Sequence, residues 1–181
     1  MAKVVTVQKA RASKKTRKCR RCGHEIQAGE PYKYVRQRVG YTRRGTLKLN
    51  FCGEHYPKGS ELASGRRAQL MGIQDAIAEG IQAATDTDSI SSMLTDAASS
   101  AEEMAGEYEE SVSNIEEGFG HPISMSEEMQ EKADAFNEWA SVLENAANEI
   151  QGIEAGDEET DDDILERAQE IADSAASELS I

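Results

Sequence analysis

The chain has 181 residues, of which 38% are hydrophobic and 5% aromatic, and its formal net charge is -14. This length allows one domain of ordinary size or two small ones, and the low apolar fraction argues against a large hydrophobic core. No apolar run approaches the roughly 18 residues that a membrane span requires, and the N-terminus lacks the apolar stretch of a secretory signal. We therefore expect a cytoplasmic protein with no membrane partner.

The charge is distributed very unevenly along the chain. Residues 1–67 hold 18 lysines and arginines against four acidic residues, a formal charge of +14. Residues 68–181 hold two basic residues against 30 acidic ones, a formal charge of -28. Such an asymmetry indicates two parts of the protein that have different partners.

Residues 1–18 are predicted to form a basic arm. A short strand is possible over Val4–Val7, and the basic residues that follow, which include Lys14 and Lys15, have little apolar surface near them to bury. A run of like charge is either a solvated tail or an arm that contacts phosphate groups. Both interpretations stay open at this point.

Residues 31–51 are predicted to form a β-hairpin. Residues 31–39 have the composition of a strand, residues 40–45 that of a turn, and residues 46–51 alternate apolar and polar side chains. Tyr32, Tyr34, Arg36 and Arg38 would share one face of the first strand, because side chains alternate with a period of two. The turn would carry Arg43 and Arg44 at the tip.

Four residues have the spacing of a metal site. Cys19 and Cys22 form a Cys-x2-Cys pair, and Cys52 and His55 form a Cys-x2-His pair. Three thiolates and one imidazole make a closed tetrahedral set for a structural Zn²⁺ ion. The hairpin between the pairs would bring them together. We therefore expect one structural zinc as the cofactor, with no coordination position left for a catalytic water.

Alternatives to this zinc site have less support in the sequence. A disulfide arrangement leaves one of the three cysteines over. A redox pair at Cys19 and Cys22 lacks the surrounding βαβ pattern, and ordinary buried thiols would not explain the spacing. His24 is a competing imidazole, but it lies two residues past Cys22 and would not easily join the same ion, so we predict that it is not a ligand.

The segment from about residue 15 to residue 80 resembles the treble-clef zinc fingers. The resemblance rests on Cys19-Arg20-Arg21-Cys22-Gly23-His24, Gly29-Glu30-Pro31-Tyr32 and Phe51-Cys52-Gly53-Glu54-His55. More narrowly, these residues with Ile26 and Ser60-Glu61-Leu62 are similar to small zinc-finger proteins encoded by bacteriophages and plasmids. That group has no settled activity, so the resemblance implies a fold, an origin on a phage or mobile element, and a location in the cytoplasm of a bacterial or archaeal host.

The acidic part is predicted to be helical. Apolar residues recur at spacings of three and four over a helix beginning near Ser60 and passing Ile81, and over residues 89–117, 125–154 and 163–179. Ser124 and Glu127 match a capping box. Because the apolar stripes are rich in alanine, we expect a helical hairpin or loose bundle that is assisted by a partner or by self-association. The fold class is therefore α+β: a small zinc-stabilised, treble-clef-like module over residues 19–67 and an acidic helical region over residues 68–181.

These features favour a non-enzymatic, nucleic-acid-binding accessory protein. No catalytic set accompanies the three histidines, and there is no phosphate-binding or dinucleotide-binding loop. The basic part would bind DNA or RNA, and the predicted contacts are Lys14, Lys15, Arg36, Arg38, Arg43 and Arg44. Two alternatives stay open: an adaptor whose helices form a protein–protein interface, and an inhibitor whose acidic helices mimic nucleic acid.

Overall fold

The computed structural model describes residues 4–8, 10, 17–38, 46–63, 65–153 and 160–179. The chain divides into two compact units, residues 1–72 and residues 73–181, which we describe separately. The first contains strands and a short helix, and the second contains helices only, so the predicted α+β class is confirmed. Among the described helices, none combines the length and apolar character needed to cross a bilayer.

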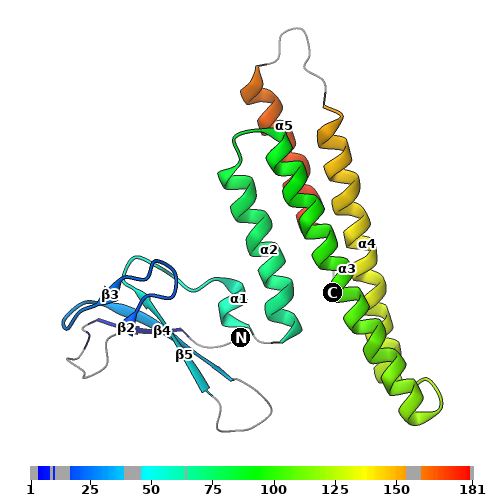
Figure 1. Cartoon of the computed structure of the whole chain (residues 1–181), viewed down its shortest axis with the longest axis horizontal. Coiled ribbons are helices and arrows are strands. Elements are labelled where there is room, and N and C mark those ends of the chain that lie inside the picture. The colour runs from blue at the N-terminus through cyan, green and yellow to red at the C-terminus, as the bar shows by residue number, and fades with distance from the viewer. Residues whose placement is uncertain are drawn as a thin grey trace. The chain divides into compact units, whose positions relative to one another are not determined.

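The N-terminal unit contains two small antiparallel sheets (Figure 1). Strands β1 (Val5–Val7), β4 (Tyr32–Arg38) and β5 (Thr46–Cys52) form a three-stranded sheet in the order β1-β4-β5. Strands β2 (Arg17–Lys18) and β3 (Glu25–Ile26) form the second sheet, which the sequence did not predict. The two strands of the predicted hairpin are confirmed as antiparallel neighbours, with Tyr32 opposite Cys52 and Arg38 opposite Thr46, and the predicted turn over residues 40–45 lies outside the described residues.

The three-stranded sheet buries its two faces unequally. Val35 and Phe51 lie on one face and are completely buried. Tyr32, Tyr34 and Arg36 lie on the opposite face, as the period of two predicts, with Tyr32 buried and Arg36 exposed. The hydrophobic cluster of this unit is small, and its buried members among the described residues are Ala10, Cys19, Ile26, Tyr32, Val35, Phe51 and Cys52.

The helix predicted to begin at Ser60 is interrupted. A short helix α1 (Gly59–Leu62) is followed by α2 (Arg66–Ala83), and the division between the two units falls within α2. The cap of α1 is Lys58, whose amide donates to the Glu61 carboxylate at 2.8 Å. Helix α1 ends at its C-cap Ala63, whose backbone is extended, and Gly65, directly before α2, has a left-handed φ of +62°.

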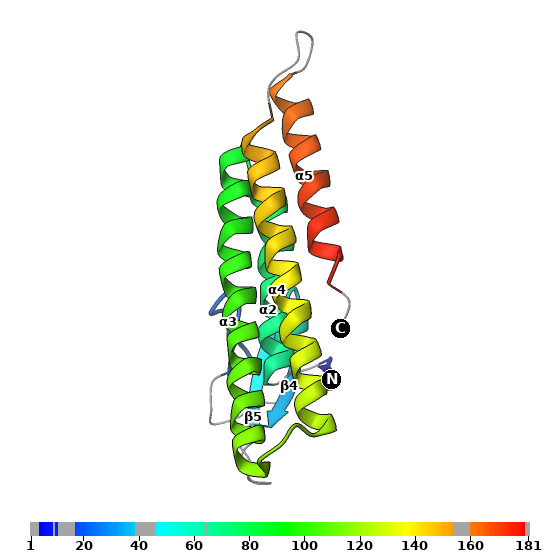
Figure 2. The same ribbon diagram turned by 90° about the vertical axis from the view of Figure 1, so that its right-hand side faces the viewer.

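The C-terminal unit is built on a long helical hairpin. Helices α3 (Thr87–Phe119) and α4 (Ser124–Gln151) run antiparallel, and α5 (Asp161–Ser177) lies beside α4 (Figure 2). The large buried side chains include Ile90, Leu94, Phe136, Trp139 and Leu143. Alanine occupies much of the remaining interface, which lets the helices approach closely: Ala97, Ala98, Ala101 and Ala105 on α3, Ala133, Ala140, Ala146 and Ala147 on α4, and Ala168, Ala172 and Ala175 on α5.

Polar contacts fix the helix ends and the helix pairs. Asp86 caps α3 by accepting from the Ser89 amide at 2.7 Å. At the start of α4, the Ser126 hydroxyl accepts from the Ile123 amide at 3.0 Å, so the predicted Ser124–Glu127 capping box is wrong. The Trp139 indole donates to the Ala175 carbonyl at 3.0 Å and thereby links α4 to α5.

The substitution Leu143→Ala tests the packing of the helical hairpin. Leu143 has an exposed fraction of 0%, so its truncation leaves a cavity between the helices. We expect a loss of about 2–5 kcal/mol in the free energy of unfolding, measured by urea denaturation with circular dichroism. The neighbouring, exposed Glu144→Ala is the control and should change stability by less than about 0.5 kcal/mol. Equal effects of the two substitutions would contradict this packing.

Candidate metal centre

The turn between β2 and β3 presents Cys19 and Cys22. The Cys19 amide donates to the His24 carbonyl at 2.8 Å, and the Gly23 amide donates to the Cys19 carbonyl at 3.0 Å. Gly23 has a φ of +72°, which a residue with a side chain adopts only with strain. The Arg20 amide donates to the Asn50 carbonyl at 2.7 Å, so this turn is attached directly to β5.

The second pair lies where β5 ends. Cys52 is the last residue of β5, and the His55 amide donates to its carbonyl at 3.3 Å. Lys33 on β4 holds this turn, because its Nζ donates to the Gly53 carbonyl at 2.6 Å and to the His55 carbonyl at 3.3 Å. Lys33 is therefore a structural cation of this unit.

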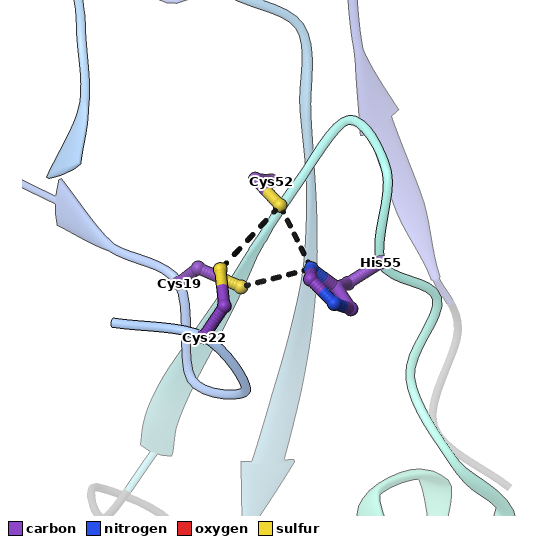
Figure 3. Close-up of side chains that lie close together, drawn as sticks. All are labelled: Cys19, Cys22, Cys52 and His55. Atoms are coloured by element: carbon purple, nitrogen blue, oxygen red, sulfur yellow. Dashed lines mark hydrogen bonds between the residues drawn. The ribbon is translucent and has the colours of Figure 1, made fainter. Parts of the chain in front are cut away.

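The four predicted ligands converge on one point (Figure 3). Their ligand atoms all lie within 4.8 Å of one another. The Nδ1 atom of His55 lies 3.0 Å from the Cys52 Sγ and 3.8 Å from the Cys19 Sγ. The Sγ atoms of Cys22 and Cys52 are 3.9 Å apart.

Two of these three distances match the edges of a tetrahedral metal site, and the 3.0 Å between the Cys52 Sγ and the His55 Nδ1 is shorter than such an edge. Metal–sulfur bonds of about 2.3 Å and metal–nitrogen bonds of about 2.0–2.1 Å give sulfur–sulfur edges of about 3.8 Å and sulfur–nitrogen edges of about 3.6 Å. The Cys22–Cys52 and Cys19–His55 distances lie close to these values. The Cys3His cluster can therefore hold a metal ion with only small side-chain movements.

The thiols of this cluster have perturbed acidities. Burial raises the pKa of Cys19, but hydrogen bonds from the backbone of Cys22, Cys52 and Arg21 outweigh it and lower the pKa to about 6. A hydrogen bond from the His24 backbone lowers the pKa of Cys22, but partial desolvation and the neighbouring sulfurs of Cys19 and Cys52 outweigh it, so the pKa is raised. Cys19 is thus a thiolate at neutral pH, which is the form that binds metals.

His24 lies outside the cluster and has a different partner. Its Nε2 is 3.1 Å from a carboxylate oxygen of Glu30. The same oxygen accepts from the Gln27 amide at 2.9 Å, and these two contacts lower the Glu30 pKa. A pocket of about 400 Å³ beside the cluster is lined in part by His24, Glu30 and the exposed Cys22.

The predicted nucleic-acid contacts are only partly covered by the structure. Lys14, Lys15, Arg43 and Arg44 lie outside the described residues, as does the side chain of Arg38, whose backbone belongs to β4. Arg36 is exposed on β4, and its guanidinium carbon lies 5.7 Å from the centre of the Tyr34 ring. These six contacts remain predictions.

The six predicted contacts leave out two cations that lie close to the tyrosines of β4. The Nζ of Lys48 lies 3.8 Å from the centre of the Tyr34 ring, and the guanidinium carbon of Arg17 lies 5.2 Å from that of Tyr32. Lys48 is paired with Arg36 across the sheet, so the hairpin register was the signal that could have identified it. We call Arg17, Tyr32, Tyr34, Arg36 and Lys48 the basic–aromatic face.

Comparisons with known proteins provide no family assignment. No protein-family model matches the chain, and searches among curated proteins and among solved structures find no significant match.

Removing single ligands tests the metal centre. We expect purified protein to contain about one metal ion per chain, and Cys52→Ser to lose most of it because a tetrahedral set loses one of its thiolates. His24→Ala is the matched control, since it removes an imidazole that contacts Glu30 instead. Elemental analysis after gel filtration gives the number of metal ions per chain. Retention of metal by Cys52→Ser, or its loss from His24→Ala, would refute this ligand set.

Lys33→Met tests the support of the ligand turn. The substitution removes the two hydrogen bonds to the carbonyls of Gly53 and His55, and groups that orient ligands typically contribute about 10–100-fold to metal affinity. We expect a loss of affinity in this range in a competition titration with a chromophoric chelator. Lys48→Met removes the same charge from the same sheet and should leave the affinity unchanged. An equal loss of metal affinity in the two variants would mean that the charge of the lysine, and not its hydrogen bonds to the ligand turn, supports the site.

Proposed function

We propose that the chain is a non-enzymatic nucleic-acid-binding accessory protein whose N-terminal unit is stabilised by one structural zinc ion. The observation that carries the binding proposal is the basic–aromatic face. The observation that supports zinc is the Cys3His cluster, whose four ligand atoms lie within 4.8 Å of one another.

Zinc is the metal that this donor set favours. Thiolate and imidazole ligands in a tetrahedral arrangement are typical of structural Zn²⁺. A unit with so small a hydrophobic cluster needs a further source of stability, and metal binding contributes on the order of 10 kcal/mol or more in zinc-finger peptides. Four protein ligands leave no open position for an activated water, which favours a structural role over a catalytic one.

A treble-clef arrangement is part of this proposal. It is supported by the order of elements: a ligand turn between β2 and β3, the β4–β5 hairpin, and a second ligand pair shortly before α1. The resemblance to zinc fingers of phages and plasmids agrees with this order. An origin on a mobile element and a location in the host cytoplasm follow from that resemblance as further parts of the proposal.

The basic–aromatic face combines the two kinds of side chain that bind nucleic acid. Arg36 and Lys48 stand opposite each other on neighbouring strands, and both lie over the Tyr34 ring. Arginine and lysine neutralise phosphates, and a tyrosine ring can stack on an unpaired base. Tyr34 is half-buried, so part of its ring is accessible, whereas the buried Tyr32 supports the face from within the hydrophobic cluster.

Three of the four acidic residues of this unit pair with basic residues that do not belong to that face. Glu25 pairs with Lys18 at 3.6 Å, Glu30 with His24 at 3.1 Å and Glu61 with Arg21 at 3.5 Å. Within the described part of the chain, no carboxylate lies within ion-pair distance of Arg36 or Lys48. The positive charge of these two side chains is therefore available to a phosphate backbone.

A salt series on the full-length, zinc-loaded chain tests the binding. Fluorescence anisotropy with a labelled single strand and a labelled duplex should give an affinity that falls with salt, because each phosphate contact releases condensed counterions. Arg36→Gln with Lys48→Gln should lower the affinity. It should also make the slope of log affinity against log salt concentration shallower by about 1.4–1.8, which corresponds to the loss of two phosphate contacts. The matched control is Lys18→Gln with Arg21→Gln, which removes the same charge from cations that already have carboxylate partners.

The outcomes separate the proposal from its alternatives. If the affinity of the unsubstituted chain did not change with salt concentration, electrostatic binding of nucleic acid would be refuted. That result would favour the alternative of an adaptor whose helices form a protein–protein interface. An equal loss in the two double variants would show that the basic–aromatic face is not the site. Tighter binding of the single strand than of the duplex would indicate that unpaired bases stack on Tyr34. Tyr34→Leu should then reduce that preference.

A further inference from the structure

A groove runs between α4 and α5 in the C-terminal unit. Its larger section has a volume of about 500 Å³, and a smaller section of about 130 Å³ continues it towards the end of α5. The two sections share Val142 and Glu178. Figure 2 shows the two helices side by side along the length of α5. The groove is therefore a continuous feature of one helix pair.

The floor of the groove is apolar, and its edges are acidic. Val142, Ile171 and Leu179 contribute apolar surface and are only half-buried. Small residues at the seam, Ala146 and Ala175, leave the space between the helices open. Four exposed carboxylates border it: Glu138, Glu149, Glu170 and Glu178.

Charge complementarity limits what this groove can bind. Residues 73–181 contain two basic residues, Lys132 and Arg167, against 30 acidic ones. A second copy of the same helical surface, a nucleic acid or an anionic membrane would be repelled at close range, since screening becomes effective only beyond about 8 Å at physiological salt. A cationic ligand with an apolar stripe satisfies both the edges and the floor.

We propose that the α4–α5 groove binds a basic amphipathic helix of a partner protein. The apolar stripe of that helix would lie on Val142, Ile171 and Leu179, and its flanking lysines or arginines would pair with Glu149, Glu170 and Glu178. This is the helix-in-groove mode of recognition, in which apolar anchors recur at three- and four-residue spacing. The groove gives the acidic unit a binding activity separate from that of the basic–aromatic face.

Two synthetic peptides test the proposal on the full-length chain. One places leucine at positions i, i+3, i+4 and i+7 among lysines, and the other has the same composition in scrambled order. Trp139, the single tryptophan, lines the smaller section of the groove, so its emission reports binding there directly. We expect the amphipathic peptide to bind roughly tenfold more tightly than the scrambled one, because only it can bury its leucines in the groove.

Charge-reversal variants locate the site. Glu149→Lys with Glu170→Lys should lower the affinity for the amphipathic peptide by about tenfold or more. The control, Glu102→Lys with Glu103→Lys, changes the net charge equally at exposed positions of α3 and should have a much smaller effect. Circular dichroism checks that each variant is folded, and the peptide comparison on the unsubstituted chain does not depend on any variant.

Three results would overturn the proposal. Equal affinity for the two peptides would show that the binding is only a general attraction between opposite charges. Equal weakening by the two double variants would place the site elsewhere on the acidic unit. A dimeric chain in sedimentation that the amphipathic peptide converts to monomers would identify a second copy as the occupant. A monomeric chain that binds the amphipathic peptide selectively, with an altered Trp139 emission, supports the proposal.

Discussion

The convergence of Cys19, Cys22, Cys52 and His55 is the constraint on which the N-terminal unit depends. The hydrophobic cluster of this unit is small, and two of its buried members are themselves ligand cysteines. A metal at this point ties the β2–β3 turn to the end of β5, while the backbone bond between Arg20 and Asn50 keeps the turn in register with the sheet. The same register sets Arg36 opposite Lys48, so the geometry of the proposed binding face depends on the sheet that carries the candidate metal ligands.

The C-terminal unit is stabilised in a different way, and this difference has functional consequences. Its interface consists of a few large side chains, such as Phe136 and Trp139, set among many alanines, so it buries modest apolar area per residue. The mutual repulsion of the 30 acidic residues in residues 68–181 further lowers the stability of this unit. A cationic partner would relieve that repulsion. The chain thus pairs a basic surface suited to phosphate with an acidic surface suited to a basic protein segment.

Local signals in the sequence predicted much of this arrangement. The Cys-x2-Cys and Cys-x2-His spacings are read directly from the sequence. The strands β4 and β5 and the helices α3, α4 and α5 follow from two-residue and 3.6-residue periodicities that each segment carries by itself. The break before α2 was missed because neither Ala63, whose backbone is extended, nor the left-handed Gly65 is a clear stop signal: alanine favours helices, and an isolated glycine also occurs within them. The gathering of Arg17 and Lys48 around two tyrosines, and the α4–α5 groove, depend on the pairing of separate elements, which no single segment encodes.

X-ray absorption at the zinc edge of the purified chain tests the central claim most directly, because it reports the atoms bonded to the metal. The proposed site predicts about three sulfur ligands near 2.3 Å and one nitrogen ligand near 2.0–2.1 Å, with no bound water. A first shell of oxygen and nitrogen atoms alone, or an absorption edge that shows no stoichiometric zinc, would contradict the account.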